Sequence, residues 1–216
     1  VGPNVLLVET SPAARSAFAS RLSRMGRRSS AIVGYREEVV DLWNHLVADW
    51  GPCRELRDDQ PLMVCAQDSA VESLAGVRRL NLSDLDAFLP AAIDMFTEEV
   101  GLSPVAGGRG PGYRARVANS IRRGRVYGRI DDGETIFKAE ICAVGRGSAQ
   151  LQGVWVTPAQ RGTGLSISGM AAVVRAARID HAPRISLYAN RHNERALRAY
   201  RRVGFQQVGT FATVLF

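Results

Sequence analysis

The residues best suited to chemistry are Arg161-Gly162-Thr163-Gly164, which follow an alternating apolar strand ending near Thr157-Pro158. They open a predicted helix of small and apolar residues from Leu165 to Ala177. The first N–H groups of a helix have no internal acceptor, and the helix dipole favours negative charge there. The two glycines let a phosphate approach the backbone without meeting a Cβ. The pattern therefore predicts a site for a phosphate-bearing ligand.

Two other interpretations of this loop can be considered when it is taken alone. It is also compatible with a plain strand-to-helix connection, because glycine-rich turns are common. A dinucleotide site is not favoured, since Ile167 stands where a third glycine belongs. The strands before the loop also read as hairpins rather than as alternating strands and helices.

A second group with chemical potential lies about thirty residues later, in a predicted helix over Asn193–Val203. Asn193 and Tyr200 are seven positions apart, two helical turns, so they share a face with the small residue Ala196. Gly204-Phe205 closes the helix. Taken by themselves, Asn193 is a good N-cap residue and Tyr200 a half-buried amphipathic anchor.

The elements that position these residues fall into two predicted domains, with a polar linker at Gln67–Gly76. Residues 1–70 read as a small α/β domain in the order β-α-β-α-β, typical of a parallel sheet. Its predicted strands are Asn4–Val8, Ser30–Val33 and Leu62–Ala66, and its helices begin at Ser11-Pro12 and at Glu37.

The sequence pattern of residues 77–216 predicts a second, larger domain of mixed strands and helices. Ser83 is the expected cap of a helix over Asp84–Val100, and Gly101–Gly112 the expected flexible loop before the next helix. The remaining predicted elements are a helix at Tyr113–Arg123, strands at Arg78–Leu82, Arg125–Ile130, Thr135–Val144, Ala149–Val156 and Arg184–Ala189, and two short strands in Phe205–Phe216 separated at Gly209-Thr210.

The chain is basic in an unusual way. Its formal net charge is +7 over 216 residues, and Lys138 is its single lysine among 28 basic residues. A GC-rich genome explains this bias most simply, although arginine also forks onto phosphate oxygens. A polyanion such as nucleic acid is therefore an alternative partner, but the arginines are dispersed and no nucleic-acid-binding motif is visible.

Composition narrows the remaining classes. With 46% hydrophobic residues the chain is of ordinary globular type. No apolar run is long enough to cross a bilayer and no signal peptide is recognisable, so no membrane partner and a cytoplasmic location are expected. The cysteines at 53, 65 and 142 have no metal-binding spacing and the three histidines are scattered, so no metal is expected.

Together these features resemble the GNAT superfamily of N-acyltransferases over residues 77–216. Arg161-Gly-Thr-Gly-Leu-Ser166 is similar to the superfamily's pyrophosphate loop, with Ser166 in place of the last small residue. Asn193, Ala196 and Tyr200 resemble its Asn-x-x-Ala-x-x-x-Tyr helix, followed by Gly-Phe. The resemblance implies an α/β (α+β) GNAT fold, whose mixed central sheet splays between its fourth and fifth strands and is flanked by helices.

The resemblance also implies an N-acetyltransferase that uses acetyl-CoA, or another acyl-CoA, as co-substrate. Tyr200 would protonate the departing thiolate, and a backbone N–H near Val154 would polarise the acyl carbonyl. The implied cofactor-binding residues are Val154, Trp155, Val156, Arg161, Gly162, Thr163, Gly164, Leu165, Ser166, Asn193, Ala196 and Tyr200.

The proton acceptor does not follow from the resemblance. Gln150 and Gln152 stand on the fourth strand, where many relatives have a Glu. The candidates are Glu140 on the third strand, then Glu98 or Glu99, then the terminal carboxylate of Phe216. The amine acceptor, a small molecule or a protein, is unidentified, and the oligomeric state is monomer or homodimer.

The N-terminal domain suggests a degenerate copy of the same fold. Thr10–Arg15 stands where a pyrophosphate loop belongs but has no glycine. This resembles tandem acyltransferases with one decayed copy, although an unrelated small α/β domain fits equally well. A non-catalytic acyl-CoA-binding or regulatory protein is therefore the alternative to an enzyme.

Overall fold

The computed structural model describes residues 4–216, and these pack as two compact units. The first unit comprises the described residues up to Met63, with Tyr188–Glu194 and Gln207–Phe216. The second comprises Val64–Leu187 and Arg195–Gln206. The units are thus interleaved in sequence, whereas the predicted domains at 1–70 and 77–216 are consecutive. Each unit is an α/β structure with a mixed sheet, in agreement with the predicted fold class.

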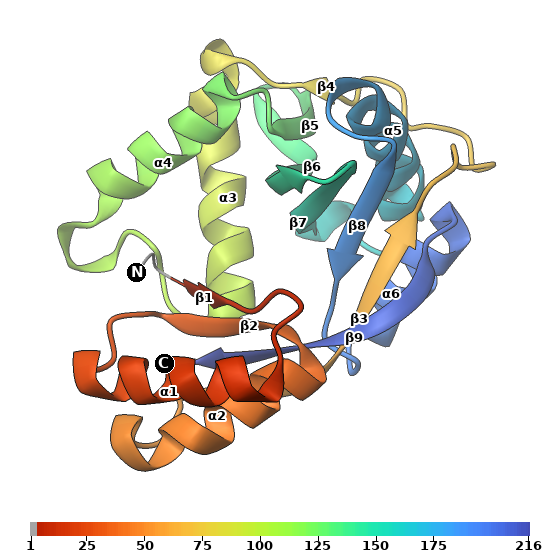
Figure 1. The fold of residues 1–216 in the computed structure, drawn as a ribbon. Coiled ribbons are helices and arrows are strands. Elements are labelled where there is room, and N and C mark those ends of the chain that lie inside the picture. The colour runs from red at the N-terminus through yellow and green to blue at the C-terminus, as the bar shows by residue number, and fades with distance from the viewer. Residues whose placement is uncertain (1–3) are drawn as a thin grey trace. The chain divides into compact units, whose positions relative to one another are not determined.

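The first unit is built on the strands in the order β1, β2, β9, β3 (Figure 1). Strand β1 (Asn4–Leu6) pairs parallel with β2 (Ala31–Tyr35), and β2 pairs antiparallel with β9 (Gln206–Leu215). Helix α1 (Pro12–Met25) connects β1 to β2, and α2 (Arg36–Trp50) leads to β3 (Glu55–Cys65). Ser11 caps α1, as its side chain accepts from the N–H of Ala14.

The core of the first unit lies between α2 and the sheet. Its side chains of zero exposure are Ile32, Val39, Leu42, Leu46, Ala212 and Val214. The ring of Phe216 packs against Trp43 and Trp50, with centroids 5.6 and 5.4 Å away. The C-terminal residue therefore belongs to the apolar packing of this unit.

The second unit has the strand order β8, β7, β6, β5, β4. The strands β4 (Arg78–Arg79), β5 (Val126–Asp131), β6 (Glu134–Gly145) and β7 (Ser148–Val156) pair antiparallel, and β7 pairs parallel with β8 (Arg184–Tyr188). The β7–β8 register ends at Gln150↔Ser186, although β7 continues to Val156. The two strands therefore part over the second half of β7, which is the splay that the sequence predicts.

Helices cover both faces of this sheet (Figure 1). The short η1 (Leu82–Asp84) leads into α3 (Leu85–Val100), and η2 (Ala106–Gly108) into α4 (Gly110–Arg122). The short η3 (Pro158–Gln160) precedes α5 (Leu165–Asp180), and α6 (Glu194–Val203) follows β8.

Two consecutive residues of β6 show that α3 and α5 lie on opposite faces of the sheet. A Cβ on Gly169 of α5 would meet the Phe137 ring at 2.8 Å, whereas the Lys138 ammonium lies 5.2 Å from the Phe88 ring of α3. Successive side chains of a strand point to opposite faces. The α3 face therefore carries Lys138.

Two strand predictions are wrong. The C-terminal residues form one continuous strand, β9, because Gly209 marks a close approach rather than a turn: a Cβ there would lie 3.1 Å from the Tyr35 ring. Strand β3 begins at Glu55, seven residues before the predicted start at Leu62. Its polar first half is mostly exposed, and within it only Gln60 is buried, with hydrogen bonds to Asn190 and Thr213.

Two local predictions around α3 and α4 also need correction. Asn81, not Ser83, is the cap before α3: its side chain accepts from the Ser83 N–H, and the Asp84 carboxylate accepts from the Asn81 N–H. The expected loop over Gly101–Gly112 is shorter, because η2 lies within it and α4 begins at Gly110. None of the helices in residues 4–216 is long and apolar enough to cross a membrane.

Candidate active site

The end of β7 is irregular where the sequence predicts ligand binding. Opposite β6, Glu140 pairs with Gln152 but Lys138 pairs with Trp155, so β7 carries one extra residue between these pairs. This is a β-bulge, which interrupts the ladder and redirects backbone groups. Gly153, with φ of +58°, and Val154 form it. Val154 thus stands where the backbone departs from regular pairing.

The glycine loop has the geometry of an anion cradle. Gly162 and Gly164 both have φ of +89°, a region that side-chain-bearing residues rarely adopt. A Cβ added at Gly164, the residue that precedes α5, would meet no atom within 4 Å. No other part of the protein therefore crowds the backbone at the residue before α5. The first turn of α5 also carries no acidic residue.

Arg161 braces the loop against α3 rather than pointing into it. Its Nε donates to the Val156 carbonyl at 3.0 Å, and its Nη2 donates to both oxygens of Glu98 at 2.8 and 2.9 Å. The guanidinium lies 5.8 Å from the Trp155 ring centre, and the Trp155 indole N–H donates to Glu98 at 3.4 Å. Arg161, Glu98 and Trp155 form a clasp, which holds the start of the loop in place.

A second arginine reaches the loop from α6. The Nη2 of Arg195 lies 3.5 Å from the position that a Cβ on Gly162 would occupy. Among residues 4–216 its side chain has no ion-pair partner. An unpaired cation beside the positive end of a helix is electrostatically favourable only when an anion joins them. The loop and Arg195 together fit a phosphate.

Tyr200 lies on α6 with its side chain half-buried. Its ring packs against Phe205 at a centroid distance of 6.0 Å, and its hydroxyl has no hydrogen-bond partner within the described part of the chain. Burial, helped by the charge of Glu99, raises the pKa of Tyr200 to about 12. The phenol is therefore protonated at neutral pH, as a proton donor must be.

Glu140 occurs in a buried ion pair. Its Oε1 lies 2.5 Å from the ammonium of Lys138, whose side chain has zero exposure, while the Glu140 side chain is 14% exposed. Gly153 faces this pair: a Cβ there would lie 3.1 Å from the Lys138 nitrogen and 2.9 Å from the Met95 methyl. The carboxylate is thus directly beside the β7 bulge.

The other predicted residues have varied surroundings. Trp155 and Val156 are buried at the end of β7, and the Thr163 hydroxyl donates to the Gln160 carbonyl within the loop. Leu165, Ser166 and Ala196 are half-buried. Asn193 lies in the turn before α6, where its N–H donates to the Asn190 carbonyl, and this turn belongs to the first unit. The candidate site described here consists of residues of the second unit alone.

The sequence interpretation missed Lys138, Arg195 and the ion pair of Glu98 with Arg161. Lys138 and Glu140 are two positions apart on a strand, so the sequence could have predicted that they lie on the same face of the sheet. The approach of Arg195 to Gly162 depends on how α6 packs against the loop, for which the sequence carries no signal.

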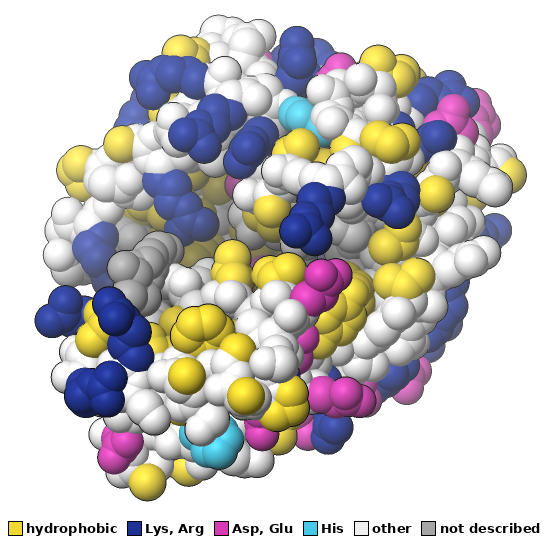
Figure 2. Space-filling view, viewed as in Figure 1, with side chains coloured by type: hydrophobic (Ala, Val, Ile, Leu, Met, Phe, Trp, Pro, Cys, Tyr) yellow, Lys and Arg dark blue, Asp and Glu magenta, His cyan; other side chains and the backbone are white. Residues whose placement is uncertain are grey.

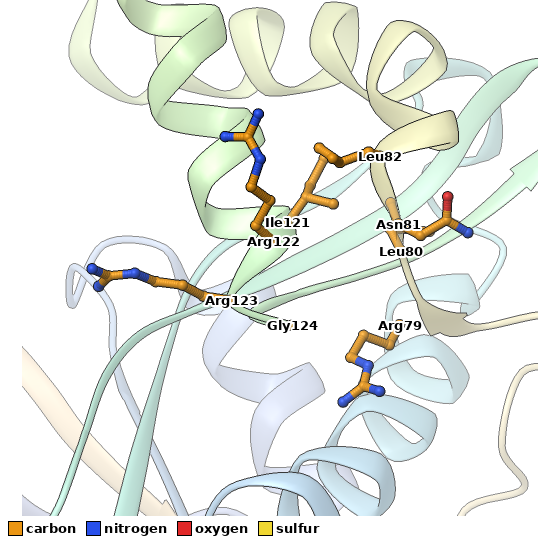
Figure 3. A pocket seen from close by; sticks show the side chains of 8 residues that line it. All are labelled: Arg79, Leu80, Asn81, Leu82, Ile121, Arg122, Arg123 and Gly124. Carbon is orange, nitrogen blue, oxygen red and sulfur yellow. The ribbon is translucent and has the colours of Figure 1, made fainter.

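A separate pocket of about 480 Å³ lies between η1 and the end of α4. Its lining residues are Arg79, Leu80, Asn81, Leu82, Ile121, Arg122, Arg123 and Gly124. None of the predicted site residues is among them. In Figure 3 the guanidinium groups of its three arginines point in different directions and do not converge on one ligand position.

The surface charge is spread rather than focused. Figure 2 shows basic side chains over most of the face in view, with acidic and apolar ones between them. Because Lys138 is fully buried, the basic side chains exposed on the described part of the chain are arginines. No single basic stripe of the kind that tracks a nucleic acid is seen on this face.

Two family models match the chain. Residues 103–205 match the Acetyltransferase (GNAT) family, and residues 1–88 match Domain of unknown function (DUF4081). The first match includes β5 to β8, the glycine loop, α5 and α6. No curated protein matches the sequence.

Solved structures share the fold at low sequence identity. A GNAT-family acetyltransferase from Colwellia psychrerythraea is 12% identical, with a TM-score of 0.62 over 97% of this chain and 75% of its own. A GCN5-related N-acetyltransferase from Kribbella flavida is 20% identical, with a TM-score of 0.57 over 99% of this chain and 78% of its own. These likenesses bear on the fold alone, and they agree with the predicted one.

Proposed function

Because residues 103–205 match the model of the Acetyltransferase (GNAT) family, we propose that the protein transfers an acetyl group from acetyl-CoA to an amine. The observation that carries the proposal is the glycine loop at the start of α5, with two residues at φ of +89° and Arg195 beside it. This arrangement suits the pyrophosphate of a CoA thioester.

The donor would lie across the residues named from the sequence. Its pyrophosphate would accept hydrogen bonds from the amides of Gly162 to Ser166, and its pantetheine arm would lie along the splayed end of β7. The Val156 carbonyl already accepts from Arg161, so the arm would pair with β7 before that residue. Ala196 is a proposed contact of the arm, and Asn193, which lies in the first unit, stays a prediction from the sequence.

The chemistry would be direct transfer within a ternary complex. A neutral amine attacks the thioester carbon, and the oxyanion that forms accepts a hydrogen bond from the N–H of Val154 at the bulge. The C–S bond then breaks, and Tyr200 donates its proton to the thiolate. The raised pKa of Tyr200, about 12, suits a group that must be protonated at neutral pH.

Among the carboxylates, Glu140 is the proposed proton acceptor. Both oxygens of Glu98 accept from Arg161. Phe216 packs in the apolar core of the first unit, against Trp43 and Trp50. Glu140 has one oxygen on Lys138 and lies beside the bulge that carries Val154.

A non-catalytic acyl-CoA-binding protein is the second candidate. The absence of a carboxylate from β7, where Gln150 and Gln152 stand, is the observation that favours it. It shares the donor site with the first proposal and differs only in having no acceptor chemistry.

The test is thiol release from acetyl-CoA over a panel of alkyl amines, amino acids, polyamines and peptide N-termini. We expect turnover with at least one amine, and a loss of about 100-fold or more in kcat for Tyr200→Phe, with little change in the KM for acetyl-CoA. Tight binding of acetyl-CoA without turnover on any amine would favour the second candidate.

A further inference from the structure

The single lysine of the chain lies in the least expected place for a charged residue. All other basic residues are arginines, but Lys138 has zero exposure and is the largest charged side chain in the interior of its unit. An isolated buried ammonium is strongly unfavourable and must be paired. Its partner is the Glu140 carboxylate, 2.5 Å away.

The surroundings of the ammonium suit a compact cation. The Phe88 ring lies 5.2 Å from the ammonium on one side, and the backbone of Gly153 closes the other. A Cβ on Gly153 would approach the ammonium to 3.1 Å, so glycine at this position leaves the ammonium its room. Lysine offers a compact cation on a flexible stem, whereas the guanidinium is a wide planar fork.

The pair is not a general stabilising device of the fold. Replacing a buried ion pair by apolar side chains is often neutral or stabilising, so burial of such a pair suggests a role beyond stability. The position supplies that role, since Gly153 lies between the pair and Val154 at the β7 bulge.

We propose that Lys138 is a positioning residue, whose ammonium holds Glu140 beside the bulge so that this carboxylate takes the proton of the attacking amine. This inference rests on the proposed function and deepens it. The N–C bond forms as the C–S bond breaks, the amine proton passes to Glu140, and the thiolate takes its proton from Tyr200. Solvent then removes the proton from Glu140 and returns one to Tyr200.

The other groups near Glu140 leave Lys138 as its one charged partner among the described residues. Burial, with the charge of Glu140, raises the pKa of Tyr113 on α4 to about 12 and that of Cys142 on β6 to about 11. Both are neutral at neutral pH. The charge of Arg116 lowers the pKa of Tyr113, and the charge of Arg125 lowers the pKa of Cys142, each by less than burial raises it. The α3 residues that face the ion pair, Phe88 and Met95, are apolar.

The test compares Glu140→Gln, Lys138→Met and the double variant, using the fastest amine of the thiol-release panel. We expect kcat to fall about 100-fold for Glu140→Gln and about 10-fold for Lys138→Met. The double variant should match Glu140→Gln, because Lys138 acts only through Glu140. In Lys138→Met the pH profile of kcat/KM should differ from that of the wild type, since the carboxylate no longer faces a cation.

A matched control exists on the neighbouring strand. Arg129 and Asp131 form a partly exposed ion pair with the same two-residue spacing on β5. Arg129→Met and Asp131→Asn should leave kcat and its pH profile unchanged. If Lys138→Met does not fold, the double variant, which leaves no unpaired charge, still separates the outcomes.

A second readout does not need an acceptor. Protein labelled with ¹⁵Nζ-lysine gives one side-chain signal, because Lys138 is the sole lysine. We expect this signal to move when acetyl-CoA is added and to change in Glu140→Gln.

Three results would overturn the inference. They are additive losses in the double variant, unchanged pH profiles in all three variants, and a lysine signal that acetyl-CoA does not move although calorimetry shows binding. Failure of the wild type to bind acetyl-CoA or to release thiol would instead overturn the proposed function, and this inference with it.

Discussion

At the scale of residues, the proposed donor-side chemistry depends on one hydroxyl without a hydrogen-bond partner among the described residues and one irregular backbone position. The Tyr200 hydroxyl donates no hydrogen bond within the described part of the chain, and the Tyr200 ring packs against Phe205. Val154 lies at the β7 bulge. The sequence identifies both residues only through their resemblance to a family pattern, because a tyrosine at this helical spacing is otherwise a common packing residue. The Lys138–Glu140 pair needed the structure, since a polar side chain on a strand is normally expected at the surface.

The ionisation of Tyr200 is directly measurable. Its pKa is raised above the ordinary value of 10.0, to about 12, first by burial. We therefore expect the phenolate absorbance difference between wild type and Tyr200→Phe to appear only near pH 12. A raised pKa also means that this tyrosine stabilises the fold below pH 10 and loses that contribution as the pH rises to 12. A difference band near pH 10 would show that the hydroxyl is solvated.

At the scale of elements, the clasp formed by Arg161, Glu98 and Trp155 connects the glycine loop to the end of α3. The guanidinium of Arg161 binds Glu98 and the Val156 carbonyl, and the loop motif does not reveal these partners. Spacing predicts which backbone forms the loop, whereas the direction of a long side chain depends on partners distant in sequence. Glu98 is 63 residues away.

Glu98→Gln tests whether the clasp is structural or catalytic. The side chains of Arg161 and Glu98 are 37% and 47% exposed, respectively. We therefore expect Glu98→Gln to lower the free energy of unfolding in urea by less than about 1 kcal/mol. Turnover should stay within about threefold of wild type, since both oxygens of Glu98 accept from Arg161 and Glu140 is the proposed proton acceptor. If Glu98→Gln keeps its activity while Glu140→Gln loses it, Glu140 is the carboxylate that the reaction needs and Glu98 is structural. A 100-fold loss in Glu98→Gln would reverse the assignment.

At the scale of the whole molecule, much of the fold follows from periodicity and turn signals. The hairpin at Asp132-Gly133, with φ of 49° and 80°, and the strand-loop-helix around Gly162 have strong local signatures. Strand β9 does not, because Gly209 has the composition of a turn but serves the close packing of Tyr35. The interleaving of the two units also escapes prediction, since it depends on which strands pair across more than a hundred residues.

The chain repeats an element order, β1-α1-β2-α2-β3 near its start and β7-α5-β8-α6-β9 near its end. In both, the first two strands pair in parallel over three residues. The turn before α1 differs from the glycine loop, because the N–H and hydroxyl of Thr10 both donate to the chain's own Glu38 carboxylate. Arg15 donates there to Asp41 and the Thr10 carbonyl. Carboxylates of α2 thus accept from the donors of this turn, whereas the first turn of α5 carries no acidic residue.

Calorimetric titration with acetyl-CoA tests this account most directly, with Gly164→Ala as the test variant and Gly133→Ala as its control. Both glycines have positive φ and open space at the Cβ position, so each substitution should destabilise the fold by about 1 kcal/mol. We predict one acetyl-CoA per wild-type chain, binding weakened at least tenfold by Gly164→Ala, and unchanged binding in Gly133→Ala. No binding by the wild type, or equal affinity in both variants, would contradict the donor site at the start of α5.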